Sequence, residues 1–241
     1  MIKGTKSSQI LAVLAKIPQF RREAVQEVTV DFCPSMTLSI KNSCPNSVIV
    51  IDRFHVQKLV TEALQEMRVQ SRWQAIKEEN ENVKKARKQK KQYCPKTYSN
   101  GDTKKQLLAR SRYLLFKPKG QWTANQSQRA NILFTNFPKL EEAYNLSMMF
   151  RSFYQYSTNK KQAKEMLDSW YKLVEEKGFD SFITTAEYIK TKEDTILNYF
   201  LNRSTNASAE SFNAKLKGFR ALVRGVRDKF FFLFRVSKLY G

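Results

Sequence analysis

Three carboxylates in this chain are of a type and in a setting that suit metal chemistry. Asp31 ends the run Glu27-Val28-Thr29-Val30, and Asp52 ends the apolar run Ser47-Val48-Ile49-Val50-Ile51. Glu210 lies much later, in Asn206-Ala207-Ser208-Ala209-Glu210-Ser211-Phe212-Asn213. Mg²⁺ prefers oxygen ligands from a few carboxylates, and two such ions can clamp both oxygens of a phosphoryl transfer. Acids at strand ends are common in α/β proteins, so the spacing favours this chemistry without establishing it.

Two predicted strands would position Asp31 and Asp52. Residues 27–32 and 47–52 are rich in β-branched residues, and residues 34–42 between them suit a short helix. A strand, helix, strand succession with apolar strands is typical of a parallel pair with a crossover helix. Ligands of such sheets gather at the carboxyl ends of the strands, which is where both aspartates lie.

A predicted helix would position Glu210. Ser204 or Thr205 is its expected N-cap, and Gly218 is its expected end. Helical spacing places Asn206 and Asn213 on the face of Glu210, while another face carries Phe212, Leu216 and Phe219.

The chain between these parts is helical in character. One long helix is expected from Arg53 into the lysine-rich run that ends at Lys91, and a Pro and Asn-Gly break follows. Further helices are expected over 102–115, 124–136, 138–156, 159–177, 180–202 and 229–236. The aromatic residues of this region are expected in the core; they are Trp122, Phe150, Phe153, Tyr154, Trp170 and Tyr171.

The composition points to a polyanionic partner. The 241 residues carry a formal net charge of +21, and DNA or RNA is the usual partner of so basic a folded protein. Two basic clusters are the expected phosphate contacts: Lys84, Lys85, Arg87, Lys88, Lys90 and Lys91, and then Lys215, Lys217, Arg220, Arg224 and Arg227. The first cluster also suits a simple solvated helix end.

The sequence lacks a membrane-spanning segment and a cysteine pattern that would bind zinc. No apolar run is long enough to cross a bilayer, so we expect no membrane partner and a cytoplasmic location. Cys33, Cys44 and Cys94 form no metal-binding spacing with the single His55, which argues against a structural zinc site.

Two motif blocks resemble the DDE transposases of bacterial insertion sequences. The first contains Val28-Thr29-Val30-Asp31 and, further on, Asp52-Arg53-Phe54-His55-Val56. The second is the Asn206 to Arg220 helix followed by Arg224-Gly225. The resemblance covers nearly the whole chain, in the branch with D-R-F-H-V and N-A-x-x-E-S-F-N motifs.

The resemblance implies an α/β fold: a partial RNase H-like core interrupted by a large all-α insertion, mostly helical overall. Residues 1–56 would form the partial core, 57–200 the insertion, and 201–241 the helices that return to the core. Asp31 and Glu210 would be the catalytic and metal-binding residues of a two-ion Mg²⁺ or Mn²⁺ site. Asp52, His55, Asn206 and Asn213 would support them, although Asp52 stays a rival to Asp31 as second metal ligand and His55 suits a structural role as well.

The resemblance also implies an activity on DNA. Complete relatives cleave phosphodiester bonds and transfer strands, with transposon ends and target DNA as partners. Their first strands, with a first catalytic Asp, have no match here, so we expect a C-terminal portion that is catalytically incomplete. An unpaired sheet edge would make it depend on a second copy or on full-length transposase.

Two alternatives stay open at this point. One is a non-catalytic DNA-binding remnant that regulates or inhibits full-length transposase. The other is a basic helical RNA-associated protein, which the absence of parallel strands below Asp31 and Asp52 would favour.

Overall fold

A computed structural model describes residues 6–240 of the chain. It is mostly helical, with 72% helix and one short parallel sheet, which confirms the predicted α/β fold with a helical insertion. The chain divides into two compact units, Met1–Arg53 with Leu201–Gly241 and Phe54–Phe200.

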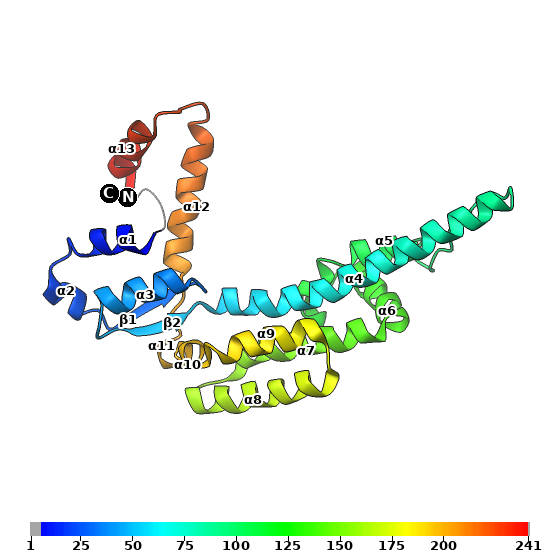
Figure 1. The fold of residues 1–241 in the computed structure, drawn as a ribbon, viewed down its shortest axis with the longest axis horizontal. Helices are drawn as coiled ribbons and strands as arrows, with labels where there is room; N and C mark the ends of the chain where they lie inside the picture. The colour runs from blue at the N-terminus through cyan, green and yellow to red at the C-terminus, as the bar shows by residue number, and fades with distance from the viewer. Residues whose placement is uncertain (1–5, 241) are drawn as a thin grey trace. The chain divides into compact units, whose positions relative to one another are not determined.

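The first unit is built on two parallel strands. β1 (Glu27–Val30) pairs with β2 (Val48–Ile51), with Glu27 opposite Val48 and Val30 opposite Ile51. The crossover is α3 (Pro34–Ser43), which packs on β1 (Figure 1). Val30 and most of β2 are buried, because apolar β-branched side chains suit a covered sheet. The predicted parallel pair is confirmed, and the RNA-associated alternative loses the observation that would have favoured it.

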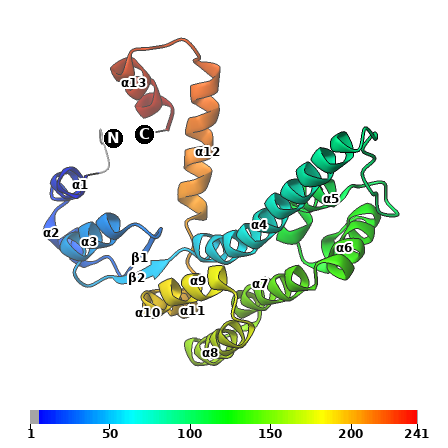
Figure 2. The same cartoon turned by 45° about the vertical axis from the view of Figure 1, so that its right-hand side comes forward.

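The other helices of the first unit precede and follow this pair of strands in the sequence. α1 (Ser7–Leu14) packs on α3, and α2 (Gln19–Glu23) leads into β1. Near the C-terminus, α12 (Ala207–Leu222) and α13 (Lys229–Tyr240) lie side by side (Figure 2). The Phe219 and Phe232 rings stack at a centroid separation of 5.6 Å, and this contact joins the two helices.

The predicted ends of the Glu210 helix are wrong at both sides. Asn206 occupies the N-cap in place of Ser204 or Thr205, because Arg203 has a left-handed backbone (φ 56°) and residues 203–205 stay irregular. Gly218 lies inside α12, which continues because the next residue, Phe219, is buried against α13. A glycine near a helix end stops the helix only where the chain needs a left-handed residue.

The second unit contains the helical segments of the middle of the chain. Its members within the described residues are α4 (Arg53–Lys88, beginning at the last residue of the first unit), α5 (Lys104–Arg110), the 3₁₀ turns η1 (Leu114–Phe116) and η2 (Lys119–Gln121), α6 (Ala124–Asn136), α7 (Pro138–Tyr156), α8 (Lys160–Lys177), α9 (Asp180–Lys190), α10 (Glu193–Leu197) and α11 (Tyr199–Asn202, ending in the first unit). The helices predicted over 124–136 and 138–156 are confirmed residue for residue. The helix predicted over 180–202 is instead three helices. The break between α9 and α10 falls at Lys192, where the backbone leaves helical geometry (φ −125°, ψ 14°).

Aromatic side chains fill the core of the second unit. α7 packs between α6 and α8, and Phe150 meets Trp170 edge to face at 4.8 Å. The indole N–H of Trp170 donates to the carbonyl of Leu146 (3.0 Å), so this fully buried side chain leaves no unpaired donor. The expected aromatic core is confirmed, although Trp122 is only half-buried.

A buried carboxylate organises the turn before α5. Asp102 is fully buried and accepts hydrogen bonds from the guanidinium groups of Arg110 and Arg129, the latter at 3.0 Å. Burial alone would raise the pKa of Asp102, but the hydrogen bonds and charges of Arg129 and Arg110 outweigh it and leave this pKa lowered. The ionised carboxylate therefore fixes α5 against α6.

No helix among residues 6–240 combines the length and the apolar character needed to cross a lipid bilayer.

Candidate active site

Asp31 and Asp52 lie at the same edge of the sheet. Each directly follows its strand, and because the strands are parallel both carboxyl ends meet there. The backbone N–H of Asp52 donates to the carbonyl of Val30 (3.0 Å), which extends the ladder and holds Asp52 beside the end of β1. Asp52 is buried and Asp31 is exposed.

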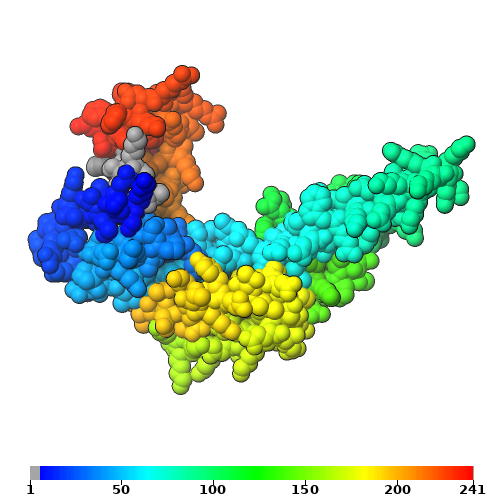
Figure 3. All heavy atoms as spheres, viewed as in Figure 1, coloured from blue at the N-terminus to red at the C-terminus, as the bar shows by residue number. Residues whose placement is uncertain are grey.

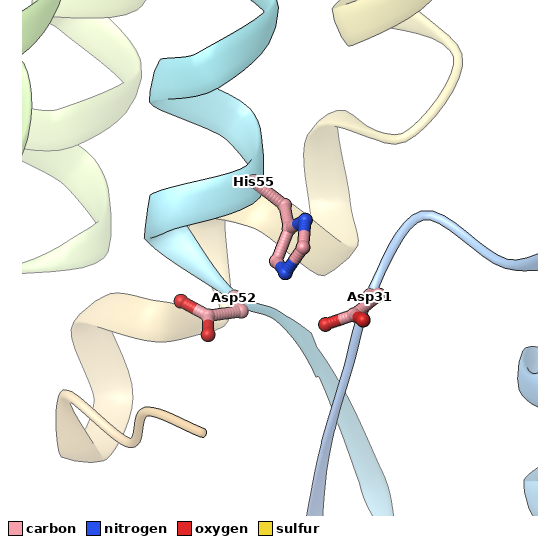
Figure 4. A group of neighbouring side chains, drawn as sticks. All are labelled: Asp31, Asp52 and His55. Carbon is pink, nitrogen blue, oxygen red and sulfur yellow. The ribbon is translucent and has the colours of Figure 1, made fainter. Parts of the chain in front are cut away.

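His55 joins these aspartates from the first turn of α4, which follows β2 without a loop. Asp31, Asp52 and His55 each offer a ligand atom within 4.8 Å of the others (Figure 4). We call these three residues the Asp-Asp-His group. In the described part of the chain, no other set of three acidic, histidine or cysteine side chains is gathered in this way.

The start of α12 lies next to Asp31. The side-chain amide of Asn206 donates to the Asp31 carboxylate (2.9 Å), although the two residues are 175 positions apart. A second contact of the same kind joins Asn202 to Glu27 at the start of β1 (2.8 Å). The returning segment is therefore tied to both ends of β1.

Glu210 lies one helical turn beyond Asn206. Its N–H donates to the Asn206 carbonyl (2.8 Å), so the backbone connects it directly to the residue that contacts Asp31. Its side chain is exposed and is not a member of the Asp-Asp-His group. Asn213, a further turn along, is exposed as well.

The donor chemistry of the group fits a divalent cation. Two carboxylates supply the oxygen ligands that Mg²⁺ and Mn²⁺ prefer. An imidazole nitrogen is more usual with transition metals, so direct ligation by His55 would favour Mn²⁺ over Mg²⁺. Asp31 and Asp52 would hold the ion.

Cys33 lies two residues after Asp31 and precedes α3. Hydrogen bonds from Ser35 and from the backbone of Met36 lower the pKa of the Cys33 thiol, while slight burial opposes them. Sequence reasoning gave this residue no role. The polar contacts of the first turn of α3 could not be read from its sequence.

The two basic clusters are exposed in their respective units. Lys84, Lys85, Arg87 and Lys88 lie at the end of α4, which extends beyond the other helices of the second unit (Figure 3). The helix ends at Lys88 and not at the predicted Lys91, because Lys90 has a left-handed backbone (φ 53°). The second cluster follows Glu210 on α12 and in the turn to α13, where the Arg220 guanidinium lies 5.0 Å from the centre of the Phe232 ring. All the predicted phosphate-contacting side chains are thus accessible to solvent.

Comparison with known families identifies the class of protein to which this sheet edge and its acids belong. The profile of a DDE family described as "Transposase" matches residues 1–236, which is nearly the whole chain. The chain belongs to the ISL3 family of DDE transposases. No curated protein and no solved structure gives a significant match.

Proposed function

We propose that the chain takes part in DNA transposition through metal-dependent phosphodiester cleavage and strand transfer, with Asp31 and Glu210 as its catalytic and metal-binding residues. The observation that supports this most directly is the contact of Asn206 with Asp31, which ties the Glu210 helix to the end of β1. Membership of a transposase family supplies the substrate class. We place the activity in the cytoplasm, where the DNA of an insertion sequence lies.

The residues around Asp31 have distinct proposed roles. Asp31 and Asp52 hold the cation. His55 either ligates the cation as well or orients the two carboxylates, and Asn206 fixes the position of the Asp31 carboxylate. Glu210 reaches the same ions when DNA is bound. Bound divalent ions supply charge stabilisation for the reacting phosphate and lower the pKa of the attacking hydroxyl. Asn213 orients DNA on the same helix face.

We also propose that the 241-residue polypeptide cleaves DNA weakly or not at all by itself. The Asp-Asp-His group supplies two carboxylates and does not include Glu210, and two carboxylates hold Mg²⁺ poorly. A second copy or full-length transposase would complete the site.

A nicking assay tests this proposal. Supercoiled DNA is incubated with the chain and Mg²⁺ or Mn²⁺, and the same assay is run with Glu210→Ala. We expect residual nicking at most from either protein. Robust cleavage that Glu210→Ala abolishes would establish the site and contradict the incompleteness.

The second candidate is a DNA-binding regulator that inhibits full-length transposase. The side chain of Glu210 is exposed and is not a member of the Asp-Asp-His group, which favours this function. Co-purification with the full-length enzyme and inhibition of its strand transfer would support this function. Restored strand transfer in the mixed assembly would instead support completion of the site.

DNA binding is proposed to use the exposed lysines at the end of α4. Lys84→Ala with Lys88→Ala should weaken duplex binding and reduce the slope of log K against log salt by about 2, since each neutralised phosphate contributes about 0.9. The matched control removes Lys161 and Lys172, which are exposed on α8. Equal losses in the two double variants would contradict a specific role for α4.

A further inference from the structure

Trp73 is the most exposed tryptophan of the chain. It lies on α4 with 65% of its surface accessible, while Trp170 is fully buried and Trp122 half-buried. Within the described residues it makes no ring or cation contact. Leaving so large an apolar side chain in water on a helix costs hydrophobic stabilisation, and aromatic residues in this position are typical of binding surfaces.

A row of lysines continues from Trp73 along the same face of α4. Lys77, Lys84 and Lys88 follow it by 4, 11 and 15 positions, which at 100° per residue keeps all three within about 60° of Trp73. At about 1.5 Å per residue the row is roughly 22 Å long. We call these four residues the Trp-Lys row.

The charge of the Trp-Lys row is available to a ligand. Lys77, Lys84 and Lys88 are exposed and form no ion pair with any residue in the described part of the chain. The neighbouring acids Glu78 and Glu79 are occupied, since they pair with Lys104 (2.7 Å) and Lys105 (2.8 Å) of α5. Glu81 is the exposed acid in this half of α4, and it borders the row, since it lies about 80° from Trp73 around the helix axis.

These features select the chemistry of the ligand. Lysines spaced along a helix suit a chain of phosphates, whereas the same row of lysines on a second copy of this chain would be repelled by it. A flat indole beside them suits a base face, but the faces of bases in a paired duplex are covered by their neighbours. Stacking on aromatic side chains is how proteins hold unpaired nucleic acid.

We propose that Trp73 stacks on a base of unpaired DNA whose phosphates follow Lys77, Lys84 and Lys88. This inference rests on the proposed DNA contact of α4 and adds its substrate class: a single-stranded or locally opened segment. Trp73 and Lys77 are residues that the sequence pattern alone did not single out.

The test uses the full chain, a thymidine oligonucleotide and a duplex of equal length. Binding of the single strand should quench tryptophan fluorescence, because Trp73 is the exposed indole. Trp73→Ala should remove that quenching and weaken single-strand binding about 5- to 100-fold, the usual effect of losing one base stack, with duplex affinity unchanged. Trp73→Phe should retain most of the affinity.

Tyr113→Ala provides the matched control, since Tyr113 is also 65% exposed but lies outside the row. Equal single-strand affinities of the Trp73→Ala and Tyr113→Ala proteins would overturn the inference, as would an equal loss of duplex and single-strand binding in Trp73→Ala. Tighter binding of a uridine RNA than of the thymidine strand would overturn the choice of DNA.

The two proposals fail in distinguishable ways. If the Lys84 and Lys88 double variant loses duplex binding while Trp73→Ala behaves as the unmodified chain, the DNA contact stands and the stacking inference fails. If that double variant binds duplex as well as its control does, the DNA contact of α4 fails first.

Discussion

At the scale of single residues, the amide of Asn206 has an unusual task for an N-cap position. N-cap side chains normally accept a hydrogen bond from the first turn of their own helix. Asn206 makes no such bond and donates to Asp31 instead. The residue thus gives up a local helix contact for a contact with the candidate active site.

Asn206→Ala should therefore lower the free energy of unfolding of the first unit by about 0.5 to 1.5 kcal/mol, the usual value of one hydrogen bond. Urea unfolding followed by circular dichroism measures this. Asn213→Ala is the matched control, because Asn213 is exposed on the same helix with no side-chain hydrogen bond among the described residues. Equal stabilities of the two variants would show that the Asp31 contact contributes nothing.

Asp102 provides a prediction about stability and pH. Asp102→Asn leaves Arg110 and Arg129 without their carboxylate and should cost about 2 to 3 kcal/mol at neutral pH. Since the folded-state pKa of Asp102 is lowered, this contribution is present above the unfolded pKa and is lost as pH falls below about 4. Unfolding curves at pH 7 and pH 3 should show the difference between the two proteins shrinking; a constant difference would contradict ionisation of Asp102.

At the scale of elements, the glycine inside α12 makes this helix less stable than an alanine at the same position would. Gly218 has ordinary helical backbone and open space where a Cβ would stand. Gly218→Ala should stabilise the helix by about 0.5 to 1 kcal/mol, because alanine loses less backbone freedom.

The comparison variant is Gly178→Ala at the end of α8. Gly178 has φ +65°, so an alanine there is strained and should destabilise by about 1 kcal/mol. Thermal unfolding of both variants should show a raised melting temperature for Gly218→Ala and a lowered one for Gly178→Ala. Destabilisation by Gly218→Ala would mean that α12 does end near Gly218 in solution.

At the scale of the whole molecule, the two units differ in how much core they hold. The second unit buries Trp170, Phe150 and Phe182 together with many leucines, whereas the sheet of the first unit has two strands. A two-stranded sheet is marginal unless helices cover it.

Residues 54–200 should therefore fold alone. We expect cooperative thermal unfolding and a near-ultraviolet dichroism signal from the packed Trp170 in this fragment, because most of its buried contacts are internal. A fragment with helical content but no cooperative transition would show that the second unit needs the first for its packing.

The sequence determined the local structure well where a single physical signal governed it. Alternation of strand and helix patterns predicted the parallel pair, and continuous helical periodicity predicted α6 and α7 within their observed bounds. The same signals were ambiguous at helix ends: α12 begins after Asn206, whose side chain contacts Asp31, a residue that local sequence does not place nearby. The motif blocks identified the family.

Tertiary structure alone decided which side chains meet. The motif resemblance implied a supporting role for Asp52 and His55 and paired Asp31 with Glu210. The fold instead gathers Asp31, Asp52 and His55, and it brings Asn206 to Asp31. It likewise left Trp73 in solvent while burying Trp170, although the two residues read alike in a helical segment. Helical periodicity fixes the angle of a side chain about its own axis, but which faces are covered depends on how the helices pack against one another, and that is set only when the whole chain folds.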